Sequence, residues 1–131
     1  MPPVYGRETI LLVEDEPAIL RVTTRMLEGL GYIVLAAATP TEAMRQVEEY
    51  PAAIHLLLTD VVIPEMSGSE LAKNLLSRLP HLRHLFMSGF PADSTGRRGV
   101  LEELFLQKPF SKSDLATRVR EALGAPPAVV R

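Results

Sequence analysis

The feature that most constrains the fold is the segment from Ile54 to Thr59, which reads IHLLLT and is apolar almost throughout. A strand with one face in water alternates apolar and polar residues, and this segment shows no such alternation. Near-continuous apolar strands are typical of parallel sheets whose two faces are both covered by helices. The segment therefore predicts an α/β fold with a parallel sheet at its centre.

Further short apolar segments, each followed by a stretch with helical features, continue this pattern along the chain. The strands expected besides 54–59 are 9–13, 33–36, 84–87 and 104–107. The expected helices are 17–30, 39–50, 67–79 and 111–123, with Gly31, Pro51, Pro80 and Gly124 at their ends. Strands that alternate with helices imply right-handed crossovers, so we expect a single domain with a doubly wound, five-stranded parallel sheet and helices on both faces.

Apolar residues at helical spacing indicate which helix faces are buried. In the first expected helix these residues are Ile19, Val22, Met26 and Leu30. In the third they are Leu71, Leu75 and Leu79. We interpret both stripes as core positions and not as a cofactor site.

The segment from Ser88 to Leu104 has no clear pattern, because it contains several glycines and a proline. We expect the fourth helix of the fold, which would lie here, to be short or mobile. The chain end after Gly124 reads APPAVVR, cannot continue a helix and predicts a tail or linker over 125–131. With an N-terminal extension over 1–7, the domain itself is predicted to cover 8–124.

Composition excludes several classes of function. The 131 residues contain no cysteine, which rules out disulfides and thiolate chemistry and fits a cytoplasmic location. The net charge of -2 comes from interspersed charges, and aromatic residues make up 5%, so direct nucleic-acid binding is not expected. No apolar segment approaches the roughly 20 residues that span a bilayer, so we expect no membrane contact by this domain.

Polar side chains follow four of the five expected strands at the point where each strand ends. Because ligands of open parallel sheets bind at the carboxyl ends of the strands, we expect these side chains to form one acidic pocket with a hydroxyl and an ammonium group. They are Glu14, Asp15 and Glu16 after the first strand, Asp60 after the third, Ser88 after the fourth and Lys108 after the fifth.

Clustered carboxylates suit a hard dication such as Mg²⁺, which takes oxygen ligands and offsets the repulsion between the negative charges. A carboxylate beside such a metal can attack a phosphoryl group and form an aspartyl phosphate. Asp60 is the best candidate for this nucleophile, because it directly follows a buried strand that would hold it rigidly.

Taken singly, these residues have simpler explanations. The acidic group after the first strand could favour a helix N-terminus through its dipole, and Asp60 could cap the loop before Pro64. Ser88 could be an ordinary turn hydroxyl, and Lys108 a solvated loop residue. Their joint position at strand ends on one side of a sheet favours a common site. The three histidines lack metal-ligand spacing, and we interpret them as structural; they are His55, His81 and His84.

Four motifs in this order resemble the receiver domains of two-component response regulators: LLVEDE, LLLTDVVIPEMSG, FMSG and FLQKPF. The resemblance covers about residues 8 to 123 and is greatest to receivers attached to hybrid histidine kinases. It implies a flavodoxin-like fold with the strand order 2-1-3-4-5. By this resemblance Asp60 is the phosphorylated residue, Asp15 binds Mg²⁺ directly, Glu14 does so through water, and the backbone carbonyl of Val62 completes the protein ligands.

The same resemblance assigns the residues that bind the phosphoryl group and transmit the signal. Ser88 and Lys108 would contact the phosphoryl oxygens, assisted by the main-chain amides of Val62 and Gly89. Ser88 and Phe105 would form the switch, although Phe105 replaces the tyrosine that is commoner there. The peptide bond from Lys108 to Pro109 is expected to be cis.

The implied function is to take a phosphoryl group from a phosphohistidine of a histidine kinase or histidine phosphotransfer protein, with Mg²⁺ bound, and to switch a partner-binding face. An isolated receiver is not an enzyme in the ordinary sense, but the chain could also belong to the cytosolic part of a membrane-bound kinase. A phosphorylation-dependent dimer is a further expectation. Two alternatives stay open: a receiver-like interaction module without phosphorylation, and a Mg²⁺-dependent phosphohydrolase, for which Val61 and Val62 leave no obvious general acid after Asp60.

Overall fold

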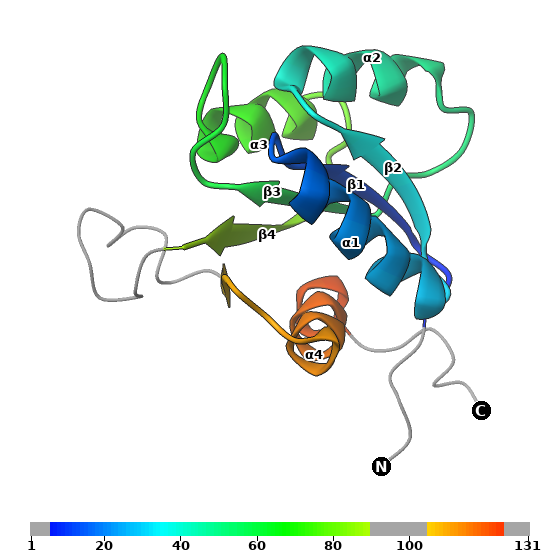
Figure 1. Cartoon of the computed structure of the whole chain (residues 1–131). Helices are drawn as coiled ribbons and strands as arrows, with labels where there is room; N and C mark the ends of the chain where they lie inside the picture. Colours follow the sequence, from blue (N-terminus) through cyan, green and yellow to red (C-terminus); the bar gives the residue numbers. More distant parts are fainter. Residues whose placement is uncertain (1–5, 90–104, 125–131) are drawn as a thin grey trace.

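The computed structural model describes residues 6–89 and 105–124, which form one parallel sheet with helices on both faces (Figure 1). The strands are β1 (Thr9–Val13), β2 (Ile33–Ala37), β3 (Leu56–Asp60), β4 (Arg83–Ser88) and β5 (Phe105–Gln107). Their order in the sheet is β2-β1-β3-β4-β5, which confirms the predicted flavodoxin-like topology. Because β2 and β3 lie on opposite sides of β1, the strand order reverses there, and a crevice is expected at the carboxyl ends of β1 and β3.

Within the described residues, two helices cover each face of the sheet, as can be followed in Figure 1. They are α1 (Pro17–Gly29), α2 (Pro40–Glu49), α3 (Gly68–Leu76) and α4 (Lys112–Leu123). Helices α1 and α4 pack on one face, and α2 and α3 pack on the other. The fourth helix expected between Ser88 and Leu104 lies outside the described residues, as do most of the predicted N-terminal extension and the whole tail, so those boundaries stay predictions.

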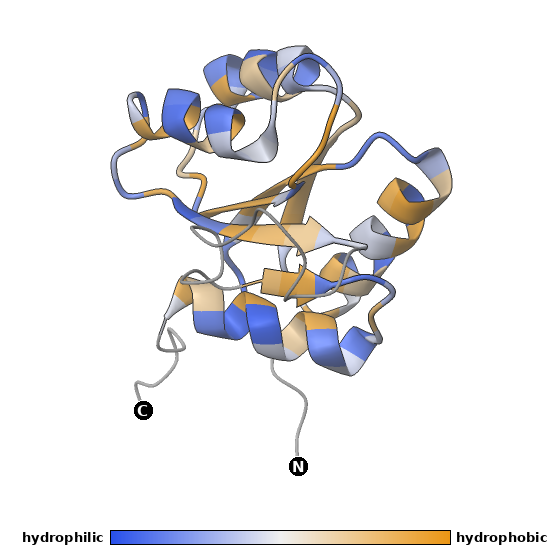
Figure 2. Ribbon diagram, turned by 90° about the vertical axis from the view of Figure 1, so that its left-hand side faces the viewer, coloured by the Kyte–Doolittle hydropathy of each residue, from blue (hydrophilic) through white to orange (hydrophobic). Residues whose placement is uncertain are grey.

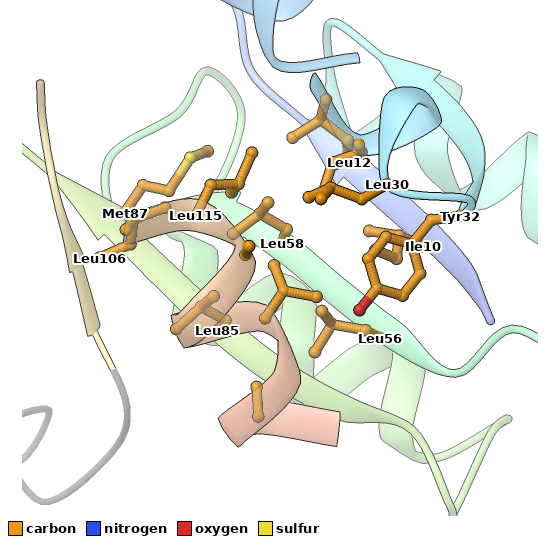
Figure 3. Close-up of a cluster of buried hydrophobic side chains, with 14 residues drawn as sticks. Ile10, Leu12, Leu30, Tyr32, Leu56, Leu58, Leu85, Met87, Leu106 and Leu115 are labelled. Carbon is orange, nitrogen blue, oxygen red and sulfur yellow. The ribbon is translucent and has the colours of Figure 1, made fainter. Parts of the chain in front are cut away.

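The apolar character of the strands is explained by burial on both faces. All five residues of β1 and all five of β3 are buried. Ile10 and Leu12 point into the core that α1 and α4 cover, whereas Leu11 and Val13 point into the core under α2 and α3. Figure 3 shows the first of these cores around Leu58, and Figure 2 shows largely hydrophobic strands between helices that carry both hydrophilic and hydrophobic residues.

Of the four helices that the structure describes, three begin with a side-chain cap. Thr39, Ser67 and Ser111 each accept a hydrogen bond from the backbone amide three residues later. The last two form reciprocal capping boxes with Glu70 and Asp114. Such caps satisfy amides that would otherwise lack a partner at the helix start, and they explain why polar residues at these positions predict the boundaries correctly.

The predicted bounds of α3 and β3 differ most from those of the structure. Helix α3 ends at Leu76, and the chain continues to Leu79 as a turn in which the amides of Arg78 and Leu79 both donate to the carbonyl of Leu75. Pro80 disfavours the helical conformation at the preceding residue. Strand β3 begins at Leu56, two residues later than expected, and includes Asp60. The strand therefore carries its last carboxylate as part of the regular ladder, paired with Met87 of β4.

The predicted buried stripe of α1 is covered only in part: Leu30 is buried and Met26 packs against the same core, but the sheet does not cover Val22. Val22 is 49% exposed, whereas Thr23 and Leu27 are fully buried. Ile19, Val22 and Met26 instead line an apolar groove against Pro109 and Phe110. Helical spacing identifies both stripes equally well, and only the position of the sheet decides which one is covered.

The two α1 stripes can be distinguished by truncation. Leu27→Ala should lower the free energy of unfolding by about 2 to 5 kcal/mol, because it leaves a cavity in the core. Val22→Ala should change it by less than about 1 kcal/mol, because the side chain is half exposed. Urea denaturation of both variants would measure the difference, and equal losses would mean that the sheet covers Val22.

Candidate functional site

The carboxyl end of β1 directs Glu14 into the molecule. The amide of Glu14 donates to the carbonyl of Ala37 at 3.1 Å, so the backbone stays extended one residue beyond the strand. Its carboxylate is 1% exposed, and Oε2 accepts a hydrogen bond from the amide of Glu16 at 2.9 Å. Asp15, between them, is exposed. The chain then turns into α1 at Pro17, which leaves Glu14 as the buried carboxylate of this acidic segment.

Asp60 is the last residue of β3 and is 6% exposed. The following amide, that of Val61, donates to the carbonyl of Met87 at 3.1 Å. The start of α3 approaches closely, so that a Cβ at Gly68 would clash with the carbonyl oxygen of Asp60. A glycine is therefore required at this point, and the tight packing holds the acidic residue in place.

Lys108 reaches the same point from the end of β5. Its Nζ donates to Glu14 Oε1 at 2.9 Å and to Asp60 Oδ1 at 2.9 Å. The backbone amide of Lys108 donates to the carbonyl of Ser88 at 2.8 Å, and its peptide bond to Pro109 is cis. The lysine thus bridges the carboxylate that follows β1 and the one that ends β3, which are 46 residues apart in the chain. The structure therefore brings together these three predicted groups.

Burial and the neighbouring charges set the protonation of this cluster. Burial, together with the adjacent Glu14 carboxylate, raises the pKa of Asp60 from 3.8 to about 7, and Lys108 opposes this rise. Burial also disfavours charge on Glu14, but hydrogen bonds from Asp60, Lys108 and the Glu16 amide outweigh it and lower the pKa of Glu14. Burial disfavours charge on Lys108 as well, but the two carboxylates more than offset it and raise its pKa. At neutral pH the cluster therefore holds Lys108 charged, Glu14 ionised and Asp60 close to its midpoint.

The carboxylates also form a group that could hold a metal. One oxygen each from Glu14, Asp15 and Asp60 can lie within 4.8 Å of one another. An all-oxygen donor set with partial access to solvent fits Mg²⁺, which keeps several waters when it binds to proteins. Within the described residues no histidine joins this group. His55 instead accepts a hydrogen bond from the amide of Thr9 through Nδ1 at 3.0 Å, in keeping with a structural role.

The structure places the remaining predicted residues on β4, on β5 and in the loops that follow β3 and β4. Ser88 is the last residue of β4 and is buried, and the position of Gly89 has open space around it. Phe105 begins β5, is partly buried and pairs with Phe86 in the sheet. Val62 lies in the loop after β3 with its side chain 73% exposed. The apolar groove beside Lys108 was missed from the sequence, because its Ile19 and Val22 had been interpreted as core.

This strand order, with carboxylates and a lysine at the crevice, defines a class of proteins, the signal receivers. The chain belongs to the response regulator receiver domain family, whose sequence profile matches residues 10–120. None of the helices in the described parts of the chain has the length and apolar character to cross a membrane.

Individual relatives are similar to most of the chain. The sensor kinase CckA of Brucella abortus (strain 2308) is 39% identical over 120 residues, which are 90% of this chain but only 13% of that kinase. The response regulator receiver protein CpdR of the same strain is 36% identical, over 87% of this chain and 95% of CpdR. The crystal structure of the receiver domain of hybrid histidine kinase CckA has a TM-score of 0.73 and 36% identity, covering 88% of this chain and 99% of that one. These relatives confirm the predicted resemblance to hybrid-kinase receivers.

The raised pKa of Asp60 predicts how stability depends on pH. Because the folded chain holds the Asp60 proton more tightly than the unfolded chain, this contribution is lost as pH rises from about 4 to about 7. Asp60→Asn mimics the neutral carboxyl, so without metal its stability relative to the native chain should rise by about 2 kcal/mol between about pH 5 and pH 8.

Urea denaturation of both proteins at the two pH values measures this difference. Added Mg²⁺ should narrow it, because a cation favours the ionised carboxyl group of the native chain. A difference that does not change with pH would mean that Asp60 titrates as an exposed aspartate does.

Proposed function

We propose that this domain accepts a phosphoryl group on Asp60, with Mg²⁺ bound, from a phosphohistidine on a histidine kinase or a histidine phosphotransfer protein. The observation that carries the proposal is the contact of Lys108 Nζ with both Asp60 and Glu14 at 2.9 Å, at the carboxyl ends of a buried parallel sheet. A carboxylate nucleophile, an acidic metal-binding group and a charged lysine are the components that aspartyl phosphorylation requires.

The transfer follows from the positions of these groups. An oxygen of the Asp60 carboxylate forms a bond to phosphorus while the bond from phosphorus to the histidine nitrogen breaks, and that nitrogen keeps the electron pair. Burial between β1 and β4 holds the Asp60 side chain rigidly, which lowers the entropic cost of reaching the reactive geometry. Lys108, the Ser88 hydroxyl and the amides of Val62 and Gly89 would bind the phosphoryl oxygens.

The metal would be held by the carboxylates of Asp15 and Asp60, by Glu14 through water and by the carbonyl of Val62. Mg²⁺ bound there supplies positive charge that neutralises the phosphoryl oxygens and keeps the Asp60 carboxyl ionised. Since Asp60 is near its midpoint at neutral pH without a cation, metal binding and readiness for attack are linked.

Phosphorylation would act as a switch through β4 and β5. The added charge on Asp60 would draw the Ser88 hydroxyl inward, and Phe105, on the neighbouring strand, would move into the space that opens. The surface formed by the last two strands and the following helix would then present a different face to its partner, and a phosphorylation-dependent dimer is one such outcome. We place the domain in the cytoplasm, either alone, as similarity to CpdR supports, or within a hybrid kinase, as similarity to CckA supports.

The alternatives are less well supported. A phosphorylation-independent interaction module would not need Asp60, Glu14 and Lys108 to be kept together in a buried cluster. A phosphohydrolase would need a second acid shortly after Asp60, where the chain has Val61 and Val62.

Acetyl phosphate tests the acceptor directly. With Mg²⁺, the native chain should gain about 80 Da in intact mass, the mass added by one aspartyl phosphate. Neither Asp60→Asn nor the native chain treated with a chelator should gain it. Persistence of the adduct in Asp60→Asn would assign the phosphate to another residue, and turnover of a small phosphate ester with Mg²⁺ would instead support the phosphohydrolase.

Lys108→Ala separates acceptance from signalling. The variant should still accept phosphate, more slowly than the native chain, because Asp60 and the metal ligands remain. Its spectrum should change less on phosphorylation, because the lysine no longer links the phosphoryl group to β5. Two-dimensional NMR of Phe105 and its neighbours would record this change, and a full native-like response in the variant would rule out the lysine as that link.

A further inference from the structure

The loop between β3 and α3 has an anchor that the site chemistry does not explain. Glu65 lies in this loop, and its Oε1 accepts hydrogen bonds from the amide of Thr41 at 3.1 Å and from the hydroxyl of Thr41 at 2.7 Å. Thr41 is 24 residues earlier in the chain, in the first turn of α2. The contact therefore joins the loop after Asp60 to a helix that contributes no residue to the proposed phosphorylation site.

The anchor completes the N-terminus of α2. The first helical residue is Pro40, which has no amide hydrogen, and the amide of Glu42 donates to the N-cap Thr39 at 3.1 Å. The amide of Ala43 donates to the carbonyl of Thr39. The amide of Thr41 therefore has no partner within α2, and it donates to the carboxylate of Glu65 instead. The helix dipole favours a negative charge at this end of the helix.

The backbone of Glu65 has an unfavourable conformation, which the contact with Thr41 compensates. Its φ is 73°, and it is the only non-glycine residue with positive φ within 6–89 and 105–124. Glycine or asparagine adopts this conformation more easily, so a glutamate here carries conformational strain. The side-chain contact with Thr41 is the compensating interaction, and glycine could not make it.

The rest of the loop is a tight turn that is closed by its own backbone contacts. The amide of Gly68 donates to the carbonyl of Val61 at 2.8 Å, and Val62 pairs with Ser67 in an isolated antiparallel bridge. Glu65 lies at the tip of this turn, and Val62 lies on the arm that leaves Asp60. An anchor at the tip therefore limits the position of the arm.

We propose that Glu65 is a positioning residue, whose bonds to Thr41 hold the loop so that the Val62 carbonyl is placed for Mg²⁺. This inference rests on the proposed function, because it assigns Val62 as a ligand. Helix α2 thereby supports the metal site, and the Mg²⁺ affinity depends on the contact between α2 and the loop that carries Glu65. Residues that orient metal ligands commonly affect metal affinity without touching the metal.

Three single variants, one double variant and a charge control test the link through Mg²⁺ affinity, measured by calorimetry, with urea denaturation of the same proteins. Glu65→Gly removes the anchor and also the backbone strain, so it should weaken Mg²⁺ binding by about tenfold while stability changes little. Thr41→Val leaves the loop sequence intact and removes only the hydroxyl donor, so it should weaken binding by about threefold. Glu65→Gln keeps an acceptor oxygen and should retain most of the affinity.

The double variant, Glu65→Gly with Thr41→Val, should bind Mg²⁺ no more weakly than Glu65→Gly alone, because both changes remove the same contact. Glu48→Gln is the matched charge control. Glu48 lies on the exposed part of α2, where it pairs with Arg78 at 2.7 Å, and its removal should leave Mg²⁺ affinity unchanged.

The outcomes separate this inference from the proposed function. If the native chain binds Mg²⁺ and Glu65→Gly binds it equally well, the positioning role is wrong while the proposed function stands. If Glu65→Gln weakens Mg²⁺ binding as much as Glu65→Gly does, the loss comes from the removed charge and not from the hydrogen bonds to Thr41, and the positioning role is again wrong. Additive losses in the double variant would contradict a shared contact. If the native chain itself binds no Mg²⁺, both proposals fail.

Discussion

The structure depends on placing Glu14 and Asp60, two buried carboxylates, at one end of an apolar sheet. Two adjacent negative charges in a buried position are unfavourable unless a cation or a proton compensates them. In this chain Lys108, at the end of β5, compensates one negative charge from 2.9 Å to each carboxylate. The pKa of Asp60 is raised, so this residue can hold a proton that compensates the other charge. The positive and negative charges of the site are thus nearly balanced, and binding of a dication or a phosphoryl group can change that balance.

The apolar sheet makes this arrangement possible. Strands β1 and β3 are buried along their whole length, so the carboxylates that end them cannot withdraw into water without disturbing the core on both faces. The Lys108 backbone is fixed in turn by its hydrogen bond to the Ser88 carbonyl. Rigidity of the sheet and of the connections after its strands thus holds these carboxylates close together although their like charges repel one another.

Prediction from the sequence succeeded where a local sequence pattern is compatible with only one local structure. Caps at Thr39, Ser67 and Ser111 mark helix starts, because few other residues satisfy the first amides. It failed for the Val22 part of the α1 stripe, because the helix face that contains Val22 and the face that contains Thr23 are about equally apolar. It also missed Glu65, since a glutamate in a loop carries no signal of a contact 24 residues away.

The sequence by itself determined the strands, their parallel arrangement and the polar residues at their ends, because apolar continuity and helix caps are local properties of the chain. It also carried the motifs by which the family is identified. Only the tertiary structure decided the distance from Lys108 to each carboxylate, the face of α1 that is buried and the anchor of Glu65 on α2. These depend on how separate segments meet in space, and long-range packing, not local preference, sets that geometry.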